Sequence, residues 1–418
     1  QMCIRDRPGS DPFVERRHFA RRQSAGRDGG TRPHPCYIPE NEFRKLRTMI
    51  RMYRRVAGVG LALTMLVAGC GHSSSTSQGP ATSSTPVPSV ATSSTRAASA
   101  TSQAARDLPD PHTLRGLTEV PELPDPKPVE GSSAQKLPVT VTDVEGNKVT
   151  IKSTSRILAL DLYGTLSRTL IGLGLGDKIV GRTVSSTEKQ LHDRPVVTEN
   201  GHVLNVEAVA GLKPSVIIAD RSVGPKEALD QLRKSGIPVV LVDPHRSVGS
   251  TPQLIRTIAD AVGKPDAGEA LVKRTQEQID QAKKQIAAWK PAKPMRVAFL
   301  YVRGNAGVFF ILGSENGASE LIQGVGADDV ASDKGITTLV PANAESLVSI
   351  NPDAIFVMRD GLASTGGMKG LLARAGVANT TAGRKQRVIS IPDGISLSFG
   401  PQTGEVLTAV AKALYGVK

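Results

Sequence analysis

A tyrosine and an arginine near the middle of the chain are spaced so that they can bind a ligand together. Tyr301 and Arg303 close an apolar run that is typical of a β-strand, and residues i and i+2 of a strand face the same side. A nearby guanidinium favours the phenolate form of a tyrosine, and phenolate oxygen suits a hard ferric ion. The pair is therefore a candidate iron ligand and its support, although a tyrosine here is more often a packed ring beside an ion-paired arginine.

A histidine 99 positions before Tyr301 is the second candidate ligand. His202 follows Glu199-Asn200-Gly201 in a polar turn just ahead of a predicted helix, where an imidazole can project freely. Imidazole nitrogen is a common ligand of iron. A lone histidine in a loop is usually a solvated surface residue, so the hypothesis depends on its occurring together with Tyr301. The two would then approach a metal from opposite halves of the chain.

The elements that must position His202 form a first α/β series. A hairpin is expected at 139–151, where period-two alternation flanks a Gly-containing turn. Short apolar runs then alternate with helical stretches, which predicts strands at 157–162, 179–181, 216–219 and 239–242 and helices near 164–175, 225–235 and 251–262. Strands separated by helices indicate βαβ units and a parallel sheet covered on both faces.

One long helix is expected to separate this series from a second one that positions Tyr301. Pro265 suits a first helical turn, apolar residues recur at three- and four-residue steps up to Trp289, and Pro291 ends the pattern. At 1.5 Å per residue this helix is about 37 Å long. Strands are then predicted at 297–302, 308–312, 354–358 and 388–391, with helices near 316–324, 343–349, 368–375 and 402–415. The predicted fold is α/β, with two Rossmann-like lobes, 138–263 and 291–418, joined by the helix 264–290.

Composition and charge exclude several classes of protein. The 418 residues carry a formal net charge of +13, and more than half of that excess lies in residues 1–55. Aromatic residues make up only 3%, with the single tryptophan Trp289, so a basic and aromatic nucleic-acid surface is not expected. All three cysteines, Cys3, Cys36 and Cys70, precede the predicted lobes. A disulfide framework or a cysteine metal site in the lobes is therefore excluded.

The N-terminal part reads as an export signal and a tether. Residues 1–48 show no period and are expected to be a spurious or disordered extension. Residues 49–70 combine arginines, an apolar run and Val67-Ala68-Gly69-Cys70, which resembles a bacterial lipobox, so we expect acyl chains on Cys70 and attachment to the outer face of a membrane. An anchor helix that happens to contain a cysteine is the alternative. The Ser-, Thr- and Pro-rich residues 71–137 predict a disordered tether.

Residues 138–418 resemble the substrate-binding lipoproteins of ABC importers, in the class that carries iron-siderophores, cobalamin and haem. Phrases typical of that class are Leu173-Gly174-Leu175-Gly176-Asp177-Lys178, Leu232-Arg233-Lys234-Ser235-Gly236-Ile237-Pro238 and Asn351-Pro352-Asp353-Ala354. Within the class, Gly366-Gly367-Met368-Lys369-Gly370-Leu371-Leu372, Thr381-Ala382-Gly383-Arg384 and Phe399-Gly400-Pro401 are most similar to the haem binders. The resemblance implies a class III periplasmic-binding-protein fold. Relatives usually have arginine after that Gly-Pro where this chain has Gln402.

The spacing of Gly201-His202-Val203 and Tyr301-Val302-Arg303-Gly304 is similar to that in the haem-binding lipoproteins of corynebacterial haem importers. That resemblance implies that His202 and Tyr301 are the axial ligands of haem iron and that Arg303 hydrogen-bonds the tyrosine. It also implies capture of haem between the lobes and delivery to an ABC permease and its ATPase. Haem would arrive free or from upstream haem-donating surface proteins.

Other residues are weaker candidates. Tyr163 could line the cleft, although core packing is the commoner role for such a ring. Arg221 and Arg359 end corresponding strands and could contact haem propionates, although paired surface arginines are more usual there. The resemblance implies one acidic permease-docking residue per lobe, for which Glu227 and Glu320 are the candidates.

An enzyme is not expected, because the sequence has no G-x-S-x-G, H-E-x-x-H or P-loop motif. The glycine run 172–176 follows a predicted helix, whereas a dinucleotide-binding loop must follow a strand. We expect a monomer with a largely preformed cleft. The alternatives are a ferric-siderophore or cobalamin binder of the same fold and, less favoured, a surface lipoprotein with no role in transport.

Overall fold

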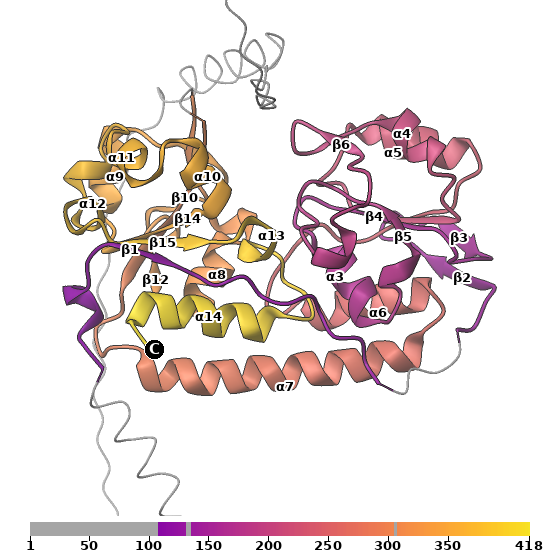
Figure 1. The fold of residues 1–418 in the computed structure, drawn as a ribbon, viewed down its shortest axis with the longest axis horizontal. Helices are drawn as coiled ribbons and strands as arrows, with labels where there is room; N and C mark the ends of the chain where they lie inside the picture. Colours follow the sequence, from indigo (N-terminus) through magenta and orange to yellow (C-terminus); the bar gives the residue numbers. More distant parts are fainter. Residues whose placement is uncertain (1–107, 131–134, 305–306) are drawn as a thin grey trace, which may run out of the picture. The chain divides into compact units, whose positions relative to one another are not determined.

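The computed structural model describes residues 108–130, 135–304 and 307–418, all within one compact unit that extends from Ser84 to Lys418 (Figure 1). Cys70, the predicted export signal and most of the predicted tether lie outside the described residues. The described chain forms two α/β lobes and the long helix predicted between them. Within these ranges, no helix combines the length and the apolar character needed to cross a bilayer.

The N-terminal lobe is built on a four-stranded parallel sheet in the order β5-β4-β8-β9. The sheet strands are β4 (Ile157–Leu160), β5 (Ile179–Gly181), β8 (Val216–Ala219) and β9 (Val239–Leu241). Two hairpins accompany the sheet, one of β2 (Val139–Thr142) and β3 (Lys148–Ile151) and one of β6 (Thr198–Glu199) and β7 (Val203–Leu204). Every residue of β4, β8 and β9 is buried, as expected for parallel strands covered on both faces. The helices are α3 (Thr165–Gly172), α4 (Val206–Gly211), α5 (Lys226–Lys234) and α6 (Thr251–Ala261), with short 3₁₀ helices η2 (Gly176–Lys178) and η3 (Lys189–Leu191).

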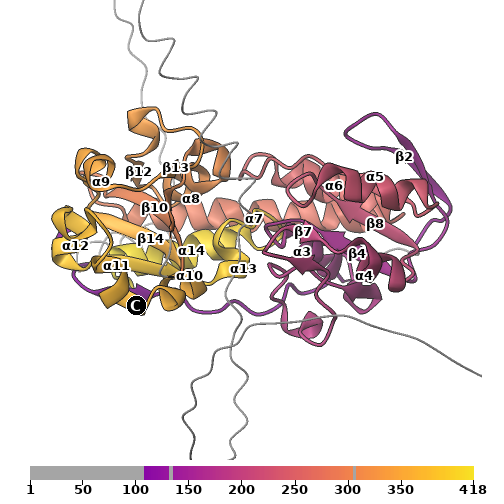
Figure 2. The same cartoon turned by 90° about the horizontal axis from the view of Figure 1, so that it is seen from above.

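Helix α7 (Pro265–Trp289) packs against α6 of the first lobe and α14 of the second. Its buried side chains include Leu271, Ile279 and Ile286, which belong to the face that the sequence predicts. Pro265 occupies its first turn, as the sequence also predicts. Figure 2 shows α7 running along both lobes, so one rigid element supports both.

The C-terminal lobe contains a seven-stranded sheet in the order β1-β15-β14-β10-β11-β13, with β12 pairing with β10. Strands β1 (Leu117–Glu119), β10 (Arg296–Arg303), β14 (Ala354–Met358) and β15 (Val388–Ile391) are parallel neighbours. Strands β11 (Val308–Ile311) and β13 (Val340–Pro341) run antiparallel to their partners, and β12 (Asp328–Asp329) is short. The helices are α8 (Ala318–Gly324), α9 (Ala344–Ile350), α10 (Arg359–Ser364), α11 (Gly367–Leu372), α12 (Thr381–Lys385), α13 (Asp393–Ser396) and α14 (Thr403–Tyr415), with 3₁₀ helices η1 (Pro111–Thr113), η4 (Ser314–Asn316), η5 (Ser332–Lys334) and η6 (Val377–Asn379).

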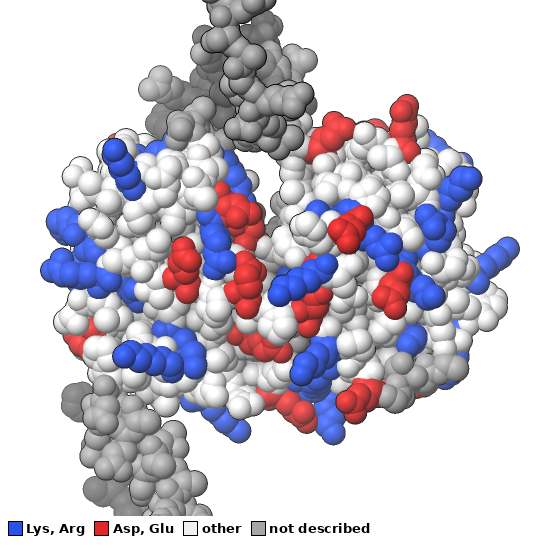
Figure 3. Space-filling model, viewed as in Figure 1, with Lys and Arg blue, Asp and Glu red and all other residues white. Residues whose placement is uncertain are grey.

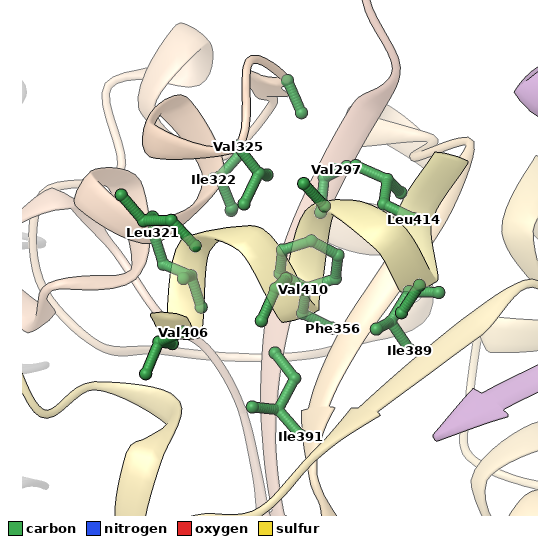
Figure 4. Packing of buried hydrophobic residues seen from close by; sticks show 14 of the residues in the cluster. Val297, Leu321, Ile322, Val325, Phe356, Ile389, Ile391, Val406, Val410 and Leu414 are labelled. Atoms are coloured by element: carbon green, nitrogen blue, oxygen red, sulfur yellow. The ribbon is translucent and has the colours of Figure 1, made fainter. Parts of the chain in front are cut away.

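Helix α14 closes one face of the C-terminal sheet. Figure 4 shows its residues Val406, Val410 and Leu414 over the sheet residues Val297 and Phe356. These side chains are almost completely buried, and each contributes about 1.5–3 kcal/mol by leaving water. This packing holds the face of β10 that carries Val297, and Tyr301 lies farther along the same strand.

The prediction of a disordered tether over 71–137 is wrong for residues 108–130 and 135–137. Strand β1 pairs in parallel with β15, and Val120 is fully buried in the core of the C-terminal lobe. The chain then reaches the N-terminal lobe, where the carboxylate of Asp125 accepts from the backbone N–H of Lys189 and Gln190. We call residues 117–129 the strap. A three-residue strand among prolines shows no period, and its order comes from long-range pairing that composition cannot reveal.

Candidate functional site

Tyr301 and Arg303 lie at the C-terminal end of β10, in the middle of the C-terminal sheet between β14 and β11. Both side chains are half-buried, and the Arg303 guanidinium carbon lies 5.0 Å from the centroid of the Tyr301 ring. The prediction that they are same-side neighbours is confirmed. Within the described residues they meet through this cation–π contact, and not through the hydrogen bond to the hydroxyl that the resemblance implies. A cation on the ring face interacts with the ring's negative quadrupole.

A carboxylate holds Arg303 in this position. Arg303 Nη2 forms a short ion pair with Asp393 and also contacts the Met358 sulfur at 3.3 Å. The second oxygen of Asp393 accepts from the backbone N–H of Asp360 at 2.8 Å. Burial raises the pKa of Asp393, and the charge of Arg303 opposes that shift. Sequence reasoning missed Asp393, although its place just after β15 was a usable signal, because the carboxyl ends of parallel strands converge.

His202 lies in the turn between β6 and β7 of the N-terminal lobe. Asn200 and Gly201 adopt left-handed conformations, with φ of 49° and 88°, which turn the chain sharply just before the histidine. The His202 carbonyl accepts from Gly224 N–H at 2.9 Å, whereas its side chain is exposed. The backbone is therefore held and the imidazole is left available to a ligand.

No hydrogen bond, ion pair or ring contact joins His202 and Tyr301 within the described chain. Figure 1 shows the β6–β7 hairpin on the edge of its lobe that faces the C-terminal lobe, and Figure 3 shows the surface hollowed between the lobes. Within the described ranges, no group of three or more His, Cys, Asp or Glu side chains could hold a metal ion.

Tyr163 lies just after β4 and packs against the core of the C-terminal lobe. The Arg246 guanidinium carbon lies 5.6 Å from its ring centroid, so each lobe pairs an arginine with a tyrosine at a strand end. Burial raises the pKa of the Tyr163 phenol. The ring is therefore partly buried against the core of the C-terminal lobe.

A buried charge cluster beneath Tyr163 was not found from the sequence. Arg246 forms a short ion pair with Asp220 and lies 3.6 Å from Asp161, and all three side chains are buried. Burial and then the negative charge of Asp220 raise the pKa of Asp161 to about 7. Burial also raises the pKa of Asp220. One guanidinium thus balances two carboxyl groups, which favours a proton on one of them.

The two other predicted arginines are already engaged by protein oxygens. Arg221 contacts the carboxylates of Glu145 at 2.8 Å and Asp230 at 2.9 Å. Arg359 forms an ion pair with Glu122 at 2.7 Å, and a short hydrogen bond joins it to the Val120 carbonyl. The described structure does not bring either of them to Tyr301 and Arg303.

The two acidic docking candidates differ in their surroundings. Glu227 is exposed in the first turn of α5, where a carboxylate is favoured by the helix dipole. Glu320 is partly buried, and its Oε2 accepts from the Val248 N–H of the other lobe at 3.1 Å. Of these two carboxylates, that of Glu227 has no hydrogen-bond or ion-pair partner among the described residues.

Comparisons with known proteins agree with this geometry. The periplasmic binding protein family matches residues 162–394. A crystal structure of the heme binding protein HmuT is 49% identical and aligns over 74% of this chain and 100% of its own, with a TM-score of 0.73. The apo form of the periplasmic heme-binding protein RhuT from Roseiflexus sp. RS-1 is 32% identical over 63% of this chain and 99% of its own, with a TM-score of 0.59.

Curated relatives belong to the same kind of protein. An uncharacterized ABC transporter substrate-binding lipoprotein, YvrC of Bacillus subtilis (strain 168), is 27% identical over 280 residues, which are 66% of this chain and 86% of that protein. A cobalamin-binding protein of Halobacterium salinarum is 24% identical over 299 residues, 70% of this chain and 78% of its own. With a family match over more than half of its length, this chain belongs to the periplasmic binding protein family and has its class III fold, two α/β lobes joined by one long helix.

Proposed function

We propose that the protein binds haem between its lobes on the outer side of a membrane and delivers it to an ABC permease driven by its ATPase. The observation that carries this proposal is the Tyr301 phenol at the end of β10, with the Arg303 guanidinium on its ring and Asp393 behind the guanidinium. A phenol supported by a cation is a suitable ligand for ferric iron.

The spacing of the three residues in a relative supports the assignment. Three solved structures of HmuT carry alanine in place of a histidine, a tyrosine and an arginine. The changed histidine and tyrosine are 99 positions apart and the tyrosine and arginine are two apart, the same intervals that separate His202, Tyr301 and Arg303 here.

Each residue has a distinct role in the proposed complex. The Tyr301 oxygen binds the iron from the C-terminal lobe, and Arg303 stays against its ring. Asp393 restrains Arg303 through their ion pair, so the guanidinium keeps its place against the ring. The exposed His202 imidazole binds the opposite face of the haem from the N-terminal lobe. Tyr163 lines the cleft floor, and Arg221 and Arg359 reach propionates only if they exchange their present carboxylate partners.

The remaining roles concern delivery and location. Glu227 meets a basic residue of the permease, and Glu320 would do so only after leaving Val248. Acyl chains on Cys70 retain the protein, as a monomer, at the membrane, and residues 71–107 form its tether. Haem reaches it free or from haem-donating surface proteins.

A haemin titration followed by absorbance tests the assignment. The parent protein should give a Soret band and a high-spin or mixed-spin ferric spectrum. Tyr301→Phe, which removes only the ligand oxygen, should weaken haem retention more than His202→Ala, because phenolate matches ferric iron better than imidazole does. His192→Ala, an exposed histidine of the same lobe, is the matched control. Spectra identical to the parent in both Tyr301→Phe and His202→Ala would reject the site.

Cobalamin is the second candidate ligand, because cobalamin-binding proteins are among the relatives. Cobalamin and ferric siderophores bring their own metal chelation and need no axial pair from the protein. Cyanocobalamin should therefore cause no thermal shift, whereas haemin should cause one that requires Tyr301. A shift with cyanocobalamin that survives Tyr301→Phe would favour the alternative.

A further inference from the structure

A groove separate from Tyr301 runs between the strap and the two long helices. It has a volume of about 790 Å³ and is lined by residues around β1, by one face of α7 and by α14. Figure 1 shows these three segments side by side, with α14 between the other two. A volume of this size lies within the range of small-molecule sites.

Small side chains keep the groove open. At Gly404 the helices touch, since a methyl group there would lie 2.5 Å from the backbone carbonyl carbon of Gln278. Farther along, the lining residues of the helices include Ala282, Ala409 and Ala413, which leave the space toward the strap unfilled. Leu123 of the strap adds an apolar edge.

The lining carries four cationic side chains that form no ion pair with an acidic side chain within the described part of the chain, namely Arg115, Arg387, Lys412 and Lys418. Lys412 Nζ also lies 3.5 Å from the backbone oxygen of Lys418. The groove also contains Glu119 and Glu405, so its lining has an excess of positive charge. Glu405 is already bound by the amides of Gln278 and Gln402. Unpaired cations gathered in one groove repel one another unless an anion joins them.

Arg387 is the most constrained of the four. Its side chain is only 2% exposed and donates to neutral oxygens, Thr118 Oγ1 at 2.7 Å and the carbonyls of Ala413 at 2.6 Å and Leu414 at 2.7 Å. Its Nε has no acceptor. Burial lowers the pKa of Arg387 to about 10. A buried cation without a counter-ion is costly, and an anion bound in the groove above it would reduce that cost.

We propose that this groove binds a small molecule that carries two or more negative charges, as phosphate or carboxylate groups. Arg115 and Lys412 contact the charges directly, and Arg387 supplies positive potential from the floor. The amides of Gln281 and Gln285 and the hydroxyl of Thr118 are available as hydrogen-bond donors, whereas the Thr408 hydroxyl already donates to the Gly404 carbonyl. This site is independent of the proposed haem site, and its ligand touches the strap and both long helices at once.

Calorimetric titration of the full chain with inorganic pyrophosphate and with citrate tests the proposal. We expect saturable binding that Arg115→Gln and Lys412→Gln each weaken about fivefold. Lys283→Gln removes one charge from an exposed position of α7 outside the groove and should leave the affinity unchanged. Arg387 is left intact because its replacement could unfold the lobe.

Flotation with phosphatidylglycerol vesicles separates two sources of the anion. Binding to vesicles that depends on Arg115 and Lys412 would assign the charges to a lipid headgroup, and binding to the soluble anions alone would assign them to a free metabolite. Binding to neither probe, or an equal loss in Lys283→Gln, would overturn the proposal. Haemin titration of the same variants should match the parent, so failure of this site and failure of the haem site are distinguishable.

Discussion

At the scale of single residues, the arrangement around Tyr301 differs from the one at Tyr163 in how its charges are balanced. Arg303 faces one partly buried carboxyl group, that of Asp393, and stays partly exposed itself. Arg246 is buried and faces two carboxyl groups. The first arrangement leaves a cation at the cleft surface, whereas the second is a closed internal cluster whose protonation should change with pH.

The contribution of Asp161 to the stability of the protein should therefore decrease as pH rises from about 4 to about 7. The pKa of Asp161 is raised from 3.8 to about 7, so the folded state holds a proton that the unfolded chain has lost. This contribution is complete below the unfolded pKa and is lost as pH rises through the folded pKa. Asp161→Asn, which keeps the neutral form, should gain on the order of 2 kcal/mol relative to the parent across this window.

Urea unfolding of the parent and of Asp161→Asn at pH 4, 5, 6 and 7 measures this difference. Asp193→Asn, a fully exposed aspartate in the same lobe, is the control and should show no such trend. A constant difference between the parent and Asp161→Asn at all four pH values would contradict the shared proton.

The sequence was sufficient to predict that Tyr301 and Arg303 are neighbours, because the period of a strand determines which side chains share a face. It was not sufficient for Asp393 or for the pairing of Asp161 and Asp220 with Arg246. Those contacts depend on the order of strands in a sheet, which is set by long-range packing. The sequence shows that these aspartates lie at or just beyond the ends of predicted strands. It does not show which arginine each of them contacts.

At the scale of elements, long apolar runs were predictable and short connected pieces were not. Strands Val216–Ala219, Ala354–Met358 and Val388–Ile391 have the predicted bounds, and α7 lies within the predicted 264–290. Helices α10, α12 and α13 and strand β1 were missed. Each has six residues or fewer, too few to show a period, and tertiary contacts determine its conformation.

The contact of the strap with the N-terminal lobe should stabilise the protein measurably. Asp125→Ala removes the acceptor for the Lys189 and Gln190 amides, which lie 2.8 and 2.9 Å from its oxygens. By analogy with the loss of a helix cap, the free energy of unfolding should fall by about 1 kcal/mol. Those two amides should also exchange their hydrogens faster.

Glu130→Ala, at an exposed position just beyond the strap, is the control and should change neither quantity. Unchanged amide exchange at Lys189 and Gln190 in Asp125→Ala would show that the strap does not hold this part of the lobe.

At the scale of the whole molecule, several contacts besides α7 connect the lobes. Arg168 of α3 is buried and donates to the Gly394 carbonyl and to Gln402 Oε1, at 3.2 and 2.8 Å. Gln402 Nε2 in turn donates to the Pro124 carbonyl of the strap at 2.9 Å. Gln402 therefore joins both lobes and the strap.

Replacing Gln402 with arginine should be harmful in this chain. Gln402→Arg would place a second guanidinium against buried Arg168, and the free energy of unfolding should fall by about 3 kcal/mol. Gln402→Met removes the hydrogen bonds without adding charge and should cost about 1 kcal/mol. Urea unfolding measures both, and equal losses in the two variants would contradict a charge conflict with Arg168.

The position of β1 also determines how mechanical load would enter the molecule. A pull on the chain ahead of Leu108 reaches η1 and then β1, and β1 is the edge strand that pairs in parallel with β15 of the C-terminal sheet. Such a strand is loaded in shear, so its bonds must rupture together rather than one by one. The C-terminal lobe would bear the tension before the strap transmits any to the N-terminal lobe. Pulling on the chain ahead of Leu108 therefore need not separate the two lobes.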